Sequence, residues 1–228
     1  MDGMIKGNKI TRVFPIPGGE FTALKGIDID IAEGAFAILR GRSGSGKTTL
    51  MNILSTLDDP TDGEVFLDGE SVKNMSQKER ENFRRKKMGF VFQSVSLIPS
   101  LSAYQNVEFA LRMAGVKINK ESAKRVEECL RKVGLGNRMS HMPQEMSGGE
   151  QQRVAIARAF VHHPKIIFAD EPTAELDSAM AAQVTETFKR MSHEEGITVL
   201  MTTHDVGLMG AADMLIELSN GERVYGDE

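Results

Sequence analysis

The chain has 228 residues, 40% hydrophobic and 26% charged, which is enough for one sizeable core with an inserted lobe. Its net charge of −4 argues against a protein that binds DNA or RNA, because such proteins usually carry a basic surface. The single cysteine, Cys129, excludes an internal disulfide and is expected to be a packed side chain.

The pattern of apolar residues predicts strands and helices along the chain, beginning with strands near the N-terminus. Residues 21–33 contain alternating apolar positions and residues 64–68 lie beside a glycine turn, which predicts half-buried strands of an antiparallel sheet. Short, continuous apolar runs are typical of strands buried on both faces of a parallel sheet, and they occur at 36–39, 90–92, 166–169 and 199–201. Apolar residues at helical spacing fill 103–133. We therefore predict an α/β core with an inserted helical lobe.

A glycine-rich loop follows the strand predicted at 36–39 and fits the pattern G-x-x-x-x-G-K-[ST], with a helix expected after it. Glycines let successive N–H groups point at phosphate oxygens, and the helix N-terminus adds its positive end. Lys47 should reach the β- and γ-phosphates, and the Thr48 hydroxyl should ligate Mg²⁺. The loop predicts a nucleoside triphosphate site made of Gly41, Arg42, Ser43, Gly44, Ser45, Gly46, Lys47, Thr48 and Thr49.

Two carboxylates, Asp170 and Glu171, end the apolar strand predicted at 166–169. Asp170 can hold Mg²⁺, and Glu171 can polarise an attacking water. Taken alone, the segment fits acids that simply end a strand. Together with the phosphate loop, it favours the second half of a site that hydrolyses a nucleotide.

The tetrapeptide Ser147-Gly148-Gly149-Glu150 precedes an amphipathic run at 151–161 and fits an S-x-x-E capping box, so taken alone it indicates a helix start. Adjacent glycines also expose N–H groups at a helix N-terminus, which makes a second anion site. Phosphate sites so far apart in the sequence suggest a nucleotide shared between two copies of the chain.

The segment 146–159, MSGGEQQRVAIARA, resembles the signature of ABC transporter ATP-binding subunits, and its spacing to Asp170 fits that family. The resemblance covers nearly the whole chain. It implies a P-loop NTPase fold of the ABC type, with a mostly parallel core sheet, an N-terminal antiparallel β-subdomain and an inserted α-helical subdomain. It also implies an ATPase that forms a homodimer around two ATP molecules.

The same resemblance implies roles for further residues. Gln93 is similar to the Q-loop glutamine that helps to organise Mg²⁺, and His204 to the switch histidine that holds the γ-phosphate. Phe14 takes the place of the aromatic residue that stacks on adenine, and Asp177 belongs to the D-loop at 174–177. The catalytic set implied is Lys47, Gln93, Glu171 and His204, the Mg²⁺ ligands are Thr48, Gln93 and Asp170, and Ser147, Gly148, Gly149, Glu150 and Asp177 act on the nucleotide of the second subunit.

Some positions depart from the family pattern. Phe14 stands where tyrosine is more usual, Met146 replaces leucine, Glu150 replaces the common glutamine, and Glu175 lies within the D-loop. A packing role for Phe14 under a loop stays open. Glu150 and Glu175 would add negative charge near the dimer interface, but none of these departures removes a catalytic group.

The resemblance implies one ABC ATPase domain over 1–228, with the ATP-binding core and β-subdomain at 1–93 and 160–228 and the helical signature subdomain at 94–159. In detail the chain resembles the compact subunits of the MacB and LolD type. That group implies an integral membrane permease as partner, which exports or extracts lipoproteins, peptides or drugs.

No apolar run approaches the roughly 18 to 20 residues of a membrane span, and residues 1–9 lack the apolar centre of a signal peptide. We therefore expect a cytoplasmic protein at the inner face of the cell membrane, which touches the membrane only through its partner and binds no nucleic acid. An alternative is a regulatory ATPase of the cell-division type, which gates a membrane protein without transport. DNA-repair or ribosome-associated ATPases of the family are disfavoured because they carry a long coiled coil or a second cassette.

Overall fold

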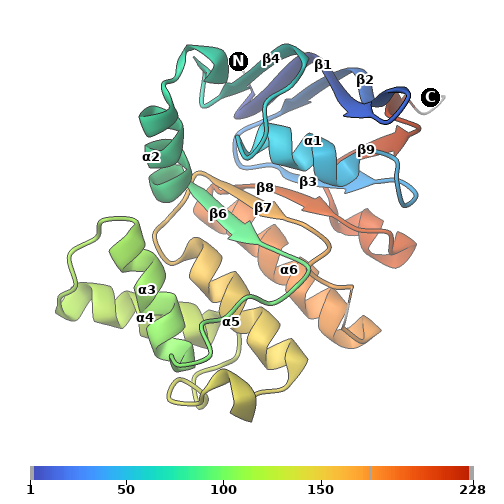
Figure 1. The fold of residues 1–228 in the computed structure, drawn as a ribbon. Coiled ribbons are helices and arrows are strands. Elements are labelled where there is room, and N and C mark those ends of the chain that lie inside the picture. Colours follow the sequence, from blue (N-terminus) through green and yellow to red (C-terminus); the bar gives the residue numbers. More distant parts are fainter. Residues whose placement is uncertain (1–2, 175, 226–228) are drawn as a thin grey trace.

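An antiparallel sheet occupies the top of the computed structural model, which describes residues 3–174 and 176–225 (Figure 1). Its strand order is β2-β1-β4-β5. The strands are β1 (Ile5–Ile16), β2 (Gly19–Ile31), β4 (Asp62–Leu67) and β5 (Glu70–Ser71). The predicted antiparallel β-subdomain is confirmed, and β1 is an addition to it. Register shifts along the β1–β2 pair break the alternation of buried residues in β1, so the sequence pattern did not indicate this strand.

A second, mostly parallel sheet forms the centre of the molecule, with strand order β10-β9-β3-β8-β7-β6. Its strands are β3 (Phe36–Arg40), β6 (Met88–Val91), β7 (Ile166–Ala169), β8 (Thr198–Thr202), β9 (Met214–Ser219) and β10 (Glu222–Val224). Only the β9–β10 pair is antiparallel among the described strands of this sheet. The prediction of a parallel core sheet is therefore confirmed.

Helices cover both faces of the core sheet. α1 (Lys47–Leu54) lies between the two sheets, and α2 (Gln77–Lys87) leads into β6 (Figure 1). The lower lobe in Figure 1 contains α3 (Ala103–Met113), α4 (Lys120–Lys132) and α5 (Gly148–Phe160), while α6 (Ser178–Glu195) packs under β3 and β8. Short 3-10 helices are η1 (Val72–Asn74), η2 (Pro143–Glu145) and η3 (Val206–Ala211). The inserted helical subdomain is confirmed, and its exact boundaries at 94 and 159 stay a prediction.

The core consists of two apolar clusters on opposite faces of the central sheet. Along β3, Ala37 and Leu39 belong to the cluster that includes α1 and the antiparallel sheet, whereas Phe36 and Ile38 belong to the cluster with the helical lobe and α6. All four side chains are fully buried. This double burial explains why the strand is a continuous apolar run. Across the described part of the chain, none of the helices has the length and apolarity needed to cross a membrane.

Candidate active site

The ends of three parallel strands gather the predicted site residues. β8 lies between β3 and β7, so their carboxyl ends meet at one edge of the sheet. β3 runs into the glycine-rich loop, β7 into Asp170 and Glu171, and β8 into Thr203 and His204. Segments that are far apart in the sequence therefore form one site.

The glycine-rich loop lines a cavity of about 620 Å³ at this edge. Gly46, the residue before α1, has φ 103°, and a Cβ atom there would lie only 2.8 Å from Leu24 Cδ2 and 2.9 Å from the Ala23 carbonyl. Only glycine fits this position without strain. α1 has no acidic residue in its first turn, so the positive end of the helix is left for an anion in the cavity.

Lys47, the first residue of α1, is buried inside the loop and is only 7% exposed. Its Nζ donates hydrogen bonds to the carbonyls of Gly41 (2.8 Å) and Arg42 (3.3 Å) and lies 4.0 Å from Glu171 Oε1. The ammonium group is thus held between the loop and Glu171, which follows β7, at the wall of the cavity.

Asp170 is fixed by hydroxyl groups from two other elements. Thr48 Oγ1 donates to Asp170 Oδ2 (3.4 Å), and Thr202 Oγ1 donates to Asp170 Oδ1 (2.6 Å). Thr202 Oγ1 also accepts a hydrogen bond from the Glu171 N–H (2.8 Å), so it aligns both acids. Sequence reasoning missed Thr202, although a polar side chain at the end of an apolar run was a signal that could have identified it.

The donors Thr48 and Asp170 fit Mg²⁺, which prefers oxygen ligands. Among the described residues, no cluster of three or more histidine, cysteine or carboxylate side chains could hold a metal by itself. The site therefore fits an ion that is also bound by phosphate oxygens, as Mg²⁺ is in many nucleotide sites.

Glu171 lies between Lys47 and His204. Its Oε2 is 3.3 Å from His204 Nδ1, and its Oε1 faces Lys47. The backbone of Glu171 has φ 45°, a conformation that is costly for residues other than glycine and recurs at functional sites. Gln93 lines the same cavity. The structure thus brings Lys47, Thr48, Gln93, Asp170, Glu171 and His204 together as predicted, while their roles stay predictions.

One aromatic side chain of the antiparallel sheet, Phe21, lines the cavity, whereas the predicted Phe14 is not among the described lining residues. Phe21 lines the cavity and is 52% exposed, and it is the register partner of Phe14 across the β1–β2 hairpin. The Arg12 guanidinium lies over the Phe14 ring at 4.6 Å. Sequence reasoning missed Phe21, since no motif marks it. The assignment of Phe14 as the adenine-stacking residue stays a prediction.

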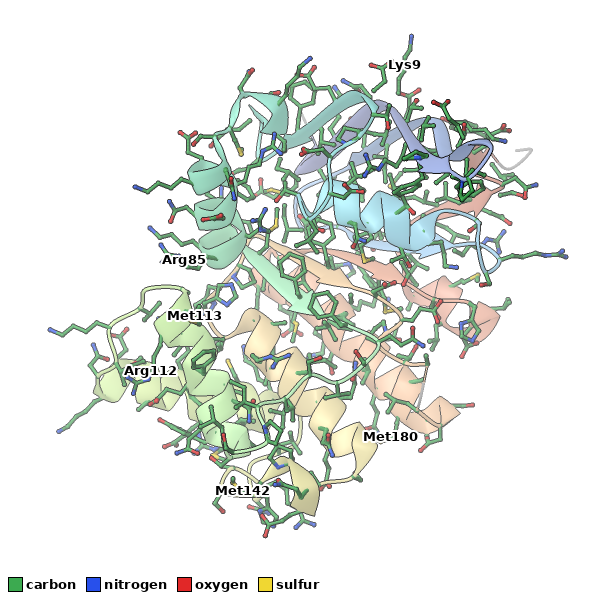
Figure 2. All side chains as sticks on the ribbon, viewed as in Figure 1. Lys9, Arg85, Arg112, Met113, Met142 and Met180 are labelled. Carbon is green, nitrogen blue, oxygen red and sulfur yellow. The ribbon has the colours of Figure 1, made fainter. Side chains whose placement is uncertain are left out.

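The signature residues start α5 in the lower lobe, away from α1 (Figure 1). Met142, just before this segment, marks the base of the lobe in Figure 2. Ser147 caps the helix, and the predicted capping box with Glu150 is present. Among the described residues, the lining of the phosphate cavity includes none of 147–150. One copy of the chain therefore does not bring the two anion sites together.

The D-loop region lies next to the signature. A Cβ atom at Gly149 would be 3.4 Å from Met180 Cε and 3.5 Å from Leu176 Cδ2, and Figure 2 labels Met180 on α6. Asp177 caps α6, because its Oδ1 accepts a hydrogen bond from the Met180 N–H (2.9 Å). Glu175 lies outside the described residues.

Comparisons with known proteins agree with this geometry. The family model described as ABC transporter matches residues 24–174.

Individual relatives match over nearly the whole chain. The chain is 45% identical over 221 residues to an uncharacterized ABC transporter ATP-binding protein, MJ1508, of Methanocaldococcus jannaschii, covering 97% of this chain and 98% of that protein. It is 40% identical over 221 residues to the lipoprotein-releasing system ATP-binding protein LolD of Syntrophus aciditrophicus, covering 97% and 99%. A dimeric structure of a post-hydrolysis state of the ATP-binding cassette MJ0796, bound to ADP and Pi, is 40% identical, covers 96% of each chain and has a TM-score of 0.88.

Proposed function

Because the chain belongs to the family of ABC transporter ATP-binding proteins and hydrolyses ATP, we propose that two copies close around two ATP molecules. The phosphate loop of one copy holds each ATP, and Ser147–Glu150 with Asp177 of the other copy cover it. The observation that carries this proposal is that the loop before α1 and the start of α5 are both glycine-containing helix N-termini, a feature that suits an anion, yet they lie apart in one chain. The related MJ0796 cassette is described as a dimer.

Within each site, Glu171 is the general base that takes a proton from the attacking water. His204 holds the γ-phosphate, and Lys47 places its positive charge on the β- and γ-phosphates. The contacts of Glu171 with both residues support this assignment. Thr48, Asp170 and Gln93 would hold Mg²⁺, which when bound neutralises charge on the phosphate oxygens.

The proposed partner is a membrane permease, whose transport cycle is driven by ATP hydrolysis. The support is the name of the relative LolD, the ATP-binding protein of a lipoprotein-releasing system. The dimer then works at the inner face of the cell membrane and drives export or extraction of lipoproteins, peptides or drugs. Co-purification of the chain with such a permease from its own cells tests this part of the proposal.

The dimer itself is tested with Glu171→Gln, which keeps the shape of the side chain but cannot take the proton. Hydrolysis should fall by about 10² to 10⁴, while ATP binding survives. Because ATP holds the two copies together, the variant should be a dimer with ATP and Mg²⁺ and a monomer with ADP, as measured by size-exclusion chromatography with light scattering.

A matched control is Glu33→Gln, the same change at an exposed position shortly before β3, and therefore at the amino end of the strand, away from the site. This variant should hydrolyse ATP at the unmodified rate. The proposal is wrong if Glu171→Gln hydrolyses ATP at the unmodified rate or stays monomeric with ATP at every concentration tested.

A further inference from the structure

Glu150 places a negative charge in the first turn of α5. Its Oε2 accepts hydrogen bonds from the Ser147 N–H (2.9 Å) and from Ser147 Oγ (3.1 Å), and the Glu150 N–H donates back to Ser147 Oγ (3.3 Å). The backbone hydrogen bond from Ser147, above all, holds the pKa of Glu150 below its ordinary value. The carboxylate is therefore ionised at neutral pH.

This charge is unfavourable for the proposed dimer. Closure brings the start of α5 against the triphosphate held by the second copy, and like charges that meet in an interface oppose association. The backbone N–H groups and the helix dipole attract phosphate at this point, whereas the Glu150 carboxylate repels it. A cation beside Glu150 would offset the repulsion.

Arg138 is placed to do so. Its Nε lies 3.2 Å from Glu150 Oε1, the oxygen that Ser147 leaves free. Its Nη1 donates to His141 Nε2 at 3.0 Å, so the guanidinium is held from two sides. The backbone is fixed as well, since the Arg138 N–H donates to the Leu135 carbonyl and the Arg138 carbonyl accepts from the His141 N–H, both at 3.0 Å.

A second cation, Arg153, also lowers the pKa of Glu150 through its charge, but it makes no ion pair with the carboxylate among the described residues. Arg153 follows one turn later on α5, and its Nη1 faces Met180 Sδ at 3.5 Å. Within the part of the chain that the structure describes, the ion pair of Glu150 is the one with Arg138. Arg138 lies in the loop after α4, which is not part of the signature motif.

We propose that Arg138 is a positioning residue for ATP-driven closure: it neutralises Glu150 and keeps the carboxylate on Ser147, so that the signature loop can accept the phosphates of ATP bound to the second copy. The inference rests on the proposed function, in which residues 147–150 act on the nucleotide of the other subunit. Arg138 touches neither the nucleotide nor the attacking water in this scheme and acts through Glu150.

The test uses the Glu171→Gln chain as parent, so that ATP is not consumed, and measures the dimer dissociation constant with ATP and Mg²⁺ by analytical ultracentrifugation. Arg138→Gln should weaken the dimer roughly 1.5-fold to fivefold per site, and so roughly twofold to 30-fold for the two sites of a dimer, because the Arg138 side chain is half exposed and exposed ion pairs have this strength. Arg138→Lys keeps the charge and should recover most of the loss. Arg131→Gln breaks an exposed ion pair with Glu127 in the same lobe and should have no effect.

A second parent chain, which also carries Glu150→Gln, distinguishes a structural role of Arg138 from charge compensation. When Glu150→Gln removes the charge, Arg138→Gln should no longer weaken the dimer. An equal loss in both backgrounds, no loss in either, or a Glu150→Gln chain that cannot dimerise would overturn the inference. If the Glu171→Gln parent itself fails to dimerise with ATP, the proposed function fails instead.

Discussion

Asp68 joins the antiparallel sheet to the core sheet. It follows β4, and its carboxylate accepts hydrogen bonds from Lys165 Nζ (2.8 and 2.7 Å) and Lys87 Nζ (2.9 Å). Lys87 ends α2 just before β6, Lys165 immediately precedes β7, and the Lys165 N–H donates to the Lys87 carbonyl. Asp68→Asn should therefore weaken the joint between the two sheets.

The expected decrease in the free energy of unfolding follows from how far these three side chains are exposed. Exposed ion pairs stabilise proteins by about 0.2 to 1 kcal/mol each, and here the Asp68 side chain is 21% exposed while Lys87 and Lys165 are 35% and 46% exposed, so each pair should lie in the upper half of this range. Two pairs then give a loss of about 1 to 2 kcal/mol in the free energy of unfolding. Urea unfolding followed by circular dichroism at about pH 7 measures this quantity.

The pH dependence gives a second, independent check. Burial by itself raises the pKa of Asp68, but the hydrogen bonds and charges of Lys165 and Lys87 outweigh it and leave the pKa lowered. The stabilisation is therefore present above the unfolded pKa of about 4 and is lost as the pH falls through the lower, folded pKa. The difference between Asp68→Asn and the unmodified chain should shrink towards zero in acid.

The matched control is Asp62→Asn, the same change at an exposed position of β4. It should alter the free energy of unfolding by less than about 0.5 kcal/mol. The reasoning is refuted if Asp68→Asn is as stable as Asp62→Asn at neutral pH, or if its deficit is the same in acid as at neutral pH.

Two further predictions concern a thiol and an aromatic pair. Cys129 is 4% exposed, and burial raises its pKa to about 12, so Ellman's reagent at about pH 8 should label it only after unfolding; rapid labelling of the folded chain would contradict the packing. Phe14→Ala should weaken ATP binding about fivefold or more, because stacking on a base contributes about 1 to 3 kcal/mol. Calorimetry on Phe14→Ala and Phe21→Ala side by side tells which ring carries the contact, and unchanged affinity for the first returns Phe14 to a packing role.

Local patterns in the sequence account for much of the fold and for most of the site. The apolar run 36–39 with its glycine loop predicts a strand, a turn and a helix because burial, backbone freedom and capping are decided by neighbours in the chain. Thr202 and Phe21 escaped prediction because their importance comes from residues across the fold, Asp170 for the first and the phosphate cavity for the second. The ion pair of Arg138 with Glu150 is of the same kind.

The neighbours of β3 determine when the molecule can first hold its substrate. This strand leads into the phosphate loop, yet it is paired on one side with β8 and on the other with β9, both from the last part of the described chain. On the ribosome the loop is made early, but its strand has no place in the sheet until the chain has passed β9. Pairing between segments so distant in sequence forms late and slowly in folding. A chain that terminates before β8 therefore carries the complete phosphate loop, but the strand that leads into this loop, β3, lacks both of its neighbours. Nucleotide binding then reports that β8 and β9 have paired with β3.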